Sequence, residues 1–163
     1  MLGYPNEEVR SSLADMYLDD VYHIEGYTTL GNEIWKALED ESIENLVKSF
    51  NLAISGIPYE DFENRDEYFY RSMFVMLLRG AGVIYFAEVH TFKGRSDVVI
   101  IFKNKVVVVE FKLAKNSSEV EKKRKEGEEQ IKSRDYSSAY KGSNKKVINF
   151  VFVADDEKRQ IVM

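Results

Sequence analysis

The chain has 163 residues, of which 44% are hydrophobic and 13% aromatic, a composition typical of one folded domain with a sizeable core. It contains no cysteine, which excludes disulfides and thiolate zinc sites, and no apolar run approaches the roughly 20 residues that a membrane-spanning helix needs. The first residues, MLGYPNEEVR, lack the pattern of a secretory signal, so we expect a cytoplasmic protein with no membrane segment.

The net charge of −5 is unevenly distributed. Residues 1–67 hold 4 Lys and Arg against 16 Asp and Glu, whereas residues 68–163 hold 19 against 12. The basic part could attract a polyanion, and the acidic part could face another protein. Solvated helix faces that merely differ in composition explain the asymmetry equally well.

The first 65 residues are predicted to be helical. Residues 5–21 begin with a plausible Pro-Asn cap followed by acids, and residues 28–55 predict one or two amphipathic helices that stop at Gly56-Ile57-Pro58. We therefore expect a helical part, residues 1–65, in front of a core, residues 66–163, within a single compact unit.

The clearest predicted helix covers residues 66–81. One apolar face is defined by side chains at helical spacing: Tyr70, Met73, Phe74, Leu77, Leu78 and Ala81. Glu67 lies one turn before Tyr70 on this face. The helix dipole alone could favour an acid there, or the side chain could point into a bordering pocket.

Strand-like runs dominate the rest of the chain. Runs rich in β-branched and aromatic residues occur at 82–90, 96–103, 105–113 and 145–155, and residues 157–163 could begin a last edge strand. A charged helix between the third and fourth runs has Val120, Gly127 and Ile131 on its predicted inward face, with Gln130 nearby. The order α-β-β-β-α-β predicts an α/β fold, a mixed sheet covered by helices.

Three charged residues interrupt the two most apolar runs. A two-residue turn at Lys103-Asn104 would place Asp97 across from Glu110, with Cβ atoms about 4.5–5.5 Å apart. Lys112 lies two residues after Glu110 and therefore shares its face.

Two carboxylates at that separation repel each other, and a divalent cation with hard oxygen ligands removes the conflict. The neighbouring lysine could then activate a water or stabilise charge on a phosphate. The pattern thus predicts metal-assisted hydrolysis of a phosphodiester. The alternative is a buried ion pair between Lys112 and one acid, with the other acid reaching solvent.

At these residues the chain resembles the PD-(D/E)XK nuclease superfamily. More specifically, it resembles the nuclease-like domain found C-terminal to archaeal and bacterial AAA-ATPase-like proteins. The resemblance rests on the segments YPNEEV, EYFYRSMFVMLLRGAG, GRSDVVI, VVVVEFKL and EEQIKSRDY. It implies a restriction-endonuclease-like core that uses Mg²⁺ or Mn²⁺.

The resemblance also implies roles for individual residues. Asp97 and Glu110 would bind the metal with the carbonyl of Phe111, and Lys112 would be the catalytic lysine. Glu67 matches an acid that helps to hold the metal in some members. Residues expected to contact substrate or support the site are Glu88, Arg95, Gln130 and Tyr136.

Two positions depart from the family pattern. Ser96 replaces the usual proline before the first acid, and Arg71 stands where a histidine is expected after Tyr70. No phosphate-binding loop of the G-x-x-x-x-G-K-[ST] type occurs, so the chain itself is not expected to hydrolyse ATP.

The leading hypothesis is a metal-dependent nuclease that acts on nucleic acid, with DNA as the expected substrate. The alternative is a catalytically inactive module of the same fold that docks to an AAA-ATPase or another protein. An ATPase module in the same or another chain and a homodimer are possible partners. Ten tyrosines and ten phenylalanines could stack on bases, although most fall at core-facing positions.

Overall fold

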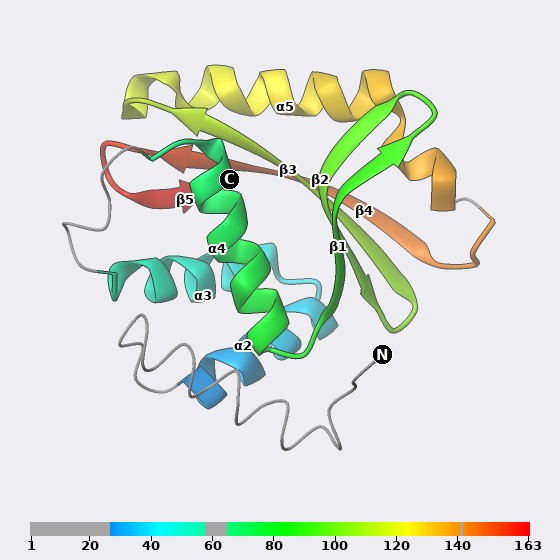
Figure 1. Cartoon of the computed structure of the whole chain (residues 1–163), viewed down its shortest axis with the longest axis horizontal. Coiled ribbons are helices and arrows are strands. Elements are labelled where there is room, and N and C mark those ends of the chain that lie inside the picture. The colour runs from blue at the N-terminus through cyan, green and yellow to red at the C-terminus, as the bar shows by residue number, and fades with distance from the viewer. Residues whose placement is uncertain (1–26, 58–64, 141) are drawn as a thin grey trace, which may run out of the picture.

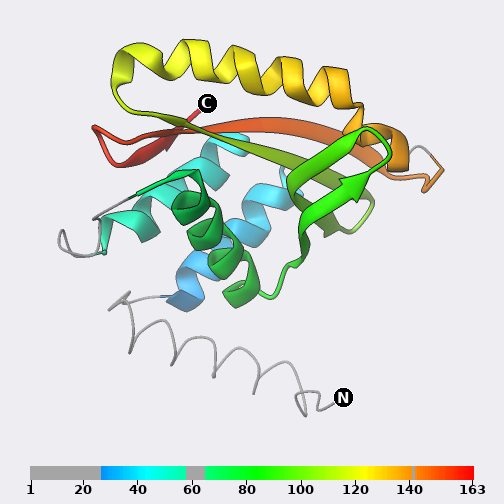
Figure 2. The ribbon, with the colours of Figure 1, turned by 45° about the horizontal axis from the view of Figure 1, so that its top comes forward.

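The computed structural model describes residues 27–57, 65–140 and 142–163. Five strands form one sheet in the order β1-β2-β3-β4-β5. Helix α5 covers one face of the sheet, and helices α2, α3 and α4 lie on the other (Figures 1 and 2). The helix predicted at residues 5–21 lies outside the described residues.

Three helices precede the sheet. Residues 28–55 form two helices, α2 (Tyr27–Glu39) and α3 (Ile43–Ser55), and α3 stops at Gly56 as predicted. The Ser42 hydroxyl caps α3 by accepting the Asn45 N–H. Helix α4 (Glu67–Gly80) begins after Asp66, whose carboxylate accepts the Phe69 N–H, and five of its six predicted core residues are buried: Tyr70, Met73, Phe74, Leu77 and Leu78.

The sheet is mixed, which confirms the predicted fold class. Its strands are β1 (Ile84–Thr91), β2 (Gly94–Phe102), β3 (Lys105–Ala114), β4 (Lys146–Asp155) and β5 (Gln160–Val162). Strands β3 and β4 are parallel, and every other neighbouring pair is antiparallel. The crossover between β3 and β4 consists of the 3-10 turn η2 (Ser117–Glu119), helix α5 (Val120–Arg134) and the 3-10 turn η3 (Tyr136–Tyr140).

The β2–β3 hairpin has the predicted register. Phe102 pairs with Lys105, and the pairing continues to Val98 opposite Val109. The turn residue with a left-handed backbone is Lys103, at φ 49°, whereas Asn104 does not have a positive φ. The two-residue length of the loop therefore set the register, although the left-handed position is not held by the residue best suited to it.

Each face of the sheet has its own core. Beneath α2, α3 and α4, the rings of Phe74, Phe111 and Phe152 meet with centroids 5.3–5.6 Å apart. Beneath α5, Val106 and Val108 pack with Ile131 and Val151. Because side chains alternate along a strand, Glu110 follows Val106 and Val108 onto the α5 face.

The short edge strand β5 is secured by a side chain of α3. The Asn51 amide donates to the Ile161 carbonyl at 2.8 Å, and its oxygen accepts the Ile161 N–H at 2.7 Å. The amide group thus occupies the backbone positions that another strand would otherwise use.

Gly127 lets α5 approach the sheet closely. A Cβ atom at this position would lie 2.5 Å from Cγ1 of Val151. We expect Gly127→Ala to lower the free energy of unfolding by about 1–2 kcal/mol, because overpacking outweighs the better helix propensity of alanine. Thermal unfolding measures the effect. In a Val151→Ala background the same change should be neutral or stabilising, and a Gly127→Ala protein as stable as the wild type would contradict the close approach.

No helix in the described part of the chain combines the length and the apolar character needed to cross a membrane.

Candidate functional site

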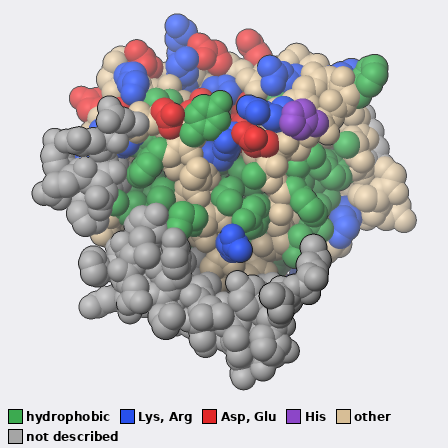
Figure 3. All heavy atoms as spheres, in the orientation of Figure 1, with side chains coloured by type: hydrophobic (Ala, Val, Ile, Leu, Met, Phe, Trp, Pro, Cys, Tyr) green, Lys and Arg blue, Asp and Glu red, His purple; other side chains and the backbone are tan. Residues whose placement is uncertain are grey.

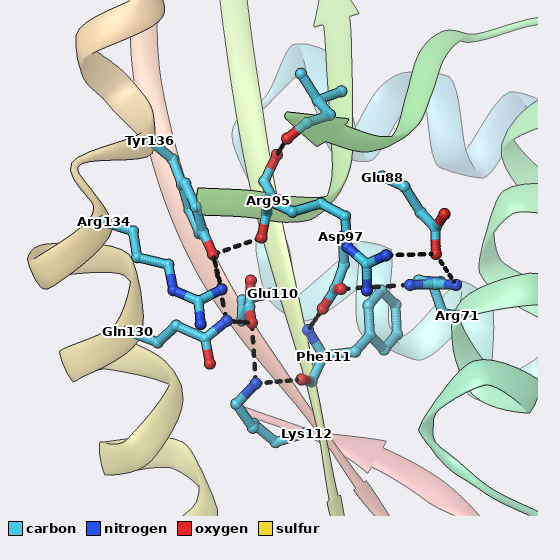
Figure 4. A network of polar contacts seen from close by, with 12 residues as sticks. Arg71, Glu88, Arg95, Asp97, Glu110, Phe111, Lys112, Gln130, Arg134 and Tyr136 are labelled. Atoms are coloured by element: carbon cyan, nitrogen blue, oxygen red, sulfur yellow. Dashed lines mark hydrogen bonds and ion pairs between the residues drawn. The ribbon is translucent and has the colours of Figure 1, made fainter. Parts of the chain in front are cut away.

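The charged residues of the two apolar runs meet where α4, β1, β2, β3 and α5 converge (Figure 4). Polar contacts run without interruption from α5 and η3 on one side, across the sheet, to α4 on the other. Strand β3 contributes Glu110 and Lys112, and β2 contributes Asp97.

Glu110 is the most deeply buried acid of this group, with 1% of its surface exposed. Its Oε1 accepts a hydrogen bond from Lys112 Nζ at 2.9 Å, and the same ammonium donates to the Phe111 carbonyl at 3.0 Å. Its Oε2 is buried and has no hydrogen-bond partner among the described residues. Burial, and then the charge of Asp97, raise the pKa of Glu110 to about 7.

Asp97 is held by groups from two directions. Its Oδ2 accepts the Phe111 N–H at 2.8 Å, and its Oδ1 lies 3.4 Å from Arg71 Nη1. The residue is 7% exposed. The backbone hydrogen bond fixes the carboxylate beside the E-x-K segment of β3, close enough for its charge to act on Glu110.

Glu67 begins α4 and belongs electrostatically to the same group. Burial raises the pKa of the Glu67 carboxyl above its ordinary value. The charge of Lys112 opposes this shift, and the charge of Asp97 adds to it. The charges of Lys112 and Asp97 thus act on the Glu67 carboxyl. Its place in the first turn of α4 is also the one that the helix dipole favours.

Arg71 is the site residue whose role the sequence left open. Its Nη2 donates to Glu88 Oε1 at 2.8 Å while Nη1 approaches Asp97, so one planar guanidinium joins two carboxylates. A signal was available, because Arg71 follows Glu67 by four residues and such residues share one side of a helix.

Glu88 has a strained backbone. Its φ is 52°, in the left-handed region that a residue with a long side chain rarely adopts. The β1–β2 register is regular on both sides, with Ala87 opposite Val98 and Val89 opposite Ser96. The Glu88 carboxylate binds Arg71 at 2.8 Å and Arg95 at 3.4 Å. Such strain persists where surrounding contacts over-determine it, and it clusters at functional sites.

The α5 side of the site is held by Gln130 and Tyr136. Gln130 Nε2 donates to Glu110 Oε1 and to the Tyr136 hydroxyl. The Tyr136 hydroxyl donates to the Arg95 carbonyl at 2.6 Å and accepts from Arg134. Tyr136 is fully buried, so its contacts support the site from within.

The arrangement matches the needs of a hard divalent cation. Two neighbouring carboxylates, a buried carboxylate oxygen without a partner and the nearby Phe111 carbonyl are all oxygen donors. Within residues 27–57, 65–140 and 142–163, no three Asp, Glu or His side chains converge as a ready-made metal cluster. The ion pair between Lys112 and Glu110, part of the alternative interpretation, is also present, but the other acid, Asp97, is buried and only 7% exposed.

Comparison with known protein families matches the part of the chain that holds this site. Residues 65–163 match the family model of the PD-(D/E)XK nuclease superfamily. The match begins just before α4 and includes every residue of the site described above. No curated protein matches the chain.

Proposed function

The chain belongs to the PD-(D/E)XK nuclease superfamily, and on that premise we propose that it hydrolyses phosphodiester bonds of nucleic acid with the help of a divalent metal ion. Its fold is restriction-endonuclease-like. The observation that carries the proposal is the buried Glu110 with one oxygen unpaired, between Asp97 and the Lys112 ammonium. A carboxylate left in this state is costly unless a cation completes its surroundings.

Asp97 and Glu110, with the carbonyl of Phe111, would hold Mg²⁺ or Mn²⁺, and Glu67 lies near enough to add its charge. When bound, such an ion acidifies a water molecule and neutralises negative charge at the phosphate. This chemistry does not require a histidine or cysteine.

The protein's own groups would orient the reactants. The Lys112 ammonium donates hydrogen bonds to Glu110 and to the Phe111 carbonyl. It would place a positive charge where the phosphate gains negative charge. Gln130 helps to hold the side chain of Glu110, and the Phe111 N–H and Arg71 together hold that of Asp97. The acids are therefore oriented before substrate binds.

A direct test is to incubate the purified chain with single-stranded DNA, duplex DNA and RNA, each with Mg²⁺, with Mn²⁺ and with a chelator. We expect cleavage that needs the ion and that disappears in Asp97→Asn. Asp66→Asn, which changes a capping acid outside the site, is the matched control. If the wild type cleaves none of the three with either ion, the hydrolase proposal fails and the interaction-module hypothesis replaces it.

Arg71→Met should reduce cleavage by about 10- to 100-fold, the usual cost of removing a group that orients a metal ligand. Arg71→Lys should restore only part of the rate, since an ammonium cannot join two carboxylates as a planar guanidinium does. Initial rates over a Mn²⁺ titration give both the maximal rate and the half-saturating concentration. An Arg71→Met protein that matches the wild type in both would rule out the orienting role.

We further propose DNA as the substrate and an ATPase module, in the same or another chain, as a partner, because the motifs resemble domains that accompany such ATPases. We also propose a homodimer and a division of the chain at residue 65. Cleavage rates with and without a genomically neighbouring ATPase test the ATPase partner, and light scattering tests the homodimer. Unchanged rates and a monomeric mass would argue against both partners.

A further inference from the structure

The β1–β2 hairpin ends in a two-residue turn that presents an aromatic side chain to solvent. Thr91 pairs with Gly94, and between them lie Phe92 and Lys93, both exposed. The Phe92 side chain is fully exposed, so it contributes nothing to either core. Binding residues are disproportionately found on loops that a rigid scaffold positions.

The hairpin is held firmly by the same residues that support the acids. Arg134 packs its side chain over Gly94, where a Cβ atom would lie 2.6 Å from Cδ of the arginine. The Tyr136 hydroxyl binds the Arg95 carbonyl, and Thr91 Oγ1 donates to the Gly94 carbonyl at 3.0 Å. The tip is therefore a preformed projection, fixed to α5 and to the site.

The hairpin tip leads directly into β2, the strand that carries Asp97. Asp97 lies five residues after Phe92, which at about 3.3 Å per residue corresponds to at most about 17 Å. One strand of nucleic acid with about 3.4 Å between nucleotides covers that distance in about five nucleotides. A strand bound at the acids can therefore also contact the hairpin tip.

Basic side chains and a second exposed aromatic ring lie next to the acids. The Arg95 side chain is 40% exposed, and Tyr68 at the start of α4 is 55% exposed, with the Arg71 guanidinium 4.6 Å from its ring centroid. Lys and Arg side chains, interspersed with Asp and Glu, gather on the α5 side of the molecule (Figure 3). Positive charge next to exposed aromatic rings is the arrangement that binds single strands.

We propose that the β1–β2 hairpin tip binds an unpaired base by stacking on Phe92, with Lys93 and Arg95 contacting the adjoining phosphates, so that the site selects single-stranded nucleic acid. The class of ligand rests on the proposed nuclease function. The preference for single strands follows from stacking, because in a duplex the base faces are already covered by their neighbours.

Fluorescence anisotropy with a labelled oligonucleotide, single-stranded or annealed, tests this in a chelator, where cleavage does not interfere. We expect Phe92→Ala to weaken binding of the single strand by about tenfold and to leave duplex binding unchanged. Phe92→Trp should keep the affinity, and its indole fluorescence, measured against a wild type that contains only Trp35, should be quenched by the single strand. Leu52→Ala, which removes another exposed apolar side chain on α3, is the control.

The proposal is overturned if Phe92→Ala binds the single strand as tightly as the wild type does, if single-strand and duplex binding fall equally, or if the wild type binds neither. The two proposals fail separately. A wild type that shows the Phe92-dependent binding but cleaves nothing defeats only the nuclease function. A wild type that cleaves with the ion, while Phe92→Ala changes neither binding nor cleavage, defeats only the stacking site.

Discussion

Replacing Lys112 by methionine should slow ion-dependent cleavage by about 10²- to 10⁴-fold, the range expected when a positioned proton-transfer or charge-stabilising group is removed. Among the described residues, Lys112 is the basic group bonded to Glu110, and its side chain is only 13% exposed, so solvent cannot replace it easily. Methionine preserves most of the apolar stem and removes the charge.

The fold should survive this change because Glu110 can take up a proton. Its pKa is already about 7, and loss of the ammonium raises the pKa further, so the buried acid becomes neutral. Circular dichroism and thermal unfolding should therefore remain close to those of the wild type near neutral pH. Lys122→Met, which alters an exposed lysine of α5, should cleave normally. If Lys112→Met cleaves as fast as the wild type, Lys112 has no role in the reaction.

Glu110 should make the stability of the protein depend on pH and on divalent cation together. Below about pH 4.5 the carboxyl is protonated in both folded and unfolded states and has no effect. Between about pH 4.5 and 7 it ionises first in the unfolded chain, so unfolding becomes easier as the pH rises. Above about pH 7 the penalty is complete, and it amounts to about 3 kcal/mol.

Glu110→Gln removes the titrating group. It should therefore be more stable than the wild type at pH 8 without a divalent cation, while cleaving nothing. At a Mn²⁺ concentration a hundredfold above Kd, the wild type should gain about 2.7 kcal/mol, and Glu110→Gln should gain far less. Urea unfolding at pH 5 and pH 8, with Mn²⁺ and with a chelator, gives four free energies of unfolding for each protein. Glu129→Gln, an exposed change on α5, should follow the wild type throughout.

Two results would contradict this account of Glu110. The first is a Glu110→Gln variant that is less stable than the wild type at pH 8 without cation, since Glu110 would then be favourably ionised. The second is an equal gain with Mn²⁺ in both proteins, since the ion would then bind elsewhere.

Much of the fold followed from local patterns. The apolar face of α4 and the two valine-rich strands specify a helix and a hairpin whatever the rest of the chain does. The register from Phe102–Lys105 to Val98–Val109 followed from the two-residue loop at Lys103-Asn104. The E-x-K spacing put Glu110 and Lys112 on one face because side chains alternate along a strand.

The surroundings of these residues could not be read from spacing. Asp97 is hydrogen-bonded to the Phe111 N–H and to Arg71. Glu110 has one carboxylate oxygen without a partner among the described residues, and Glu88 has a left-handed backbone. Each of these features depends on residues from distant segments. Whether a buried carboxylate finds hydrogen-bond partners depends on all the groups within a few ångströms of it. Tertiary packing determines which groups these are. Periodicity thus fixed the elements and their faces, whereas the packing of α4 and α5 against the sheet determined the partners, burial and charge of the acids.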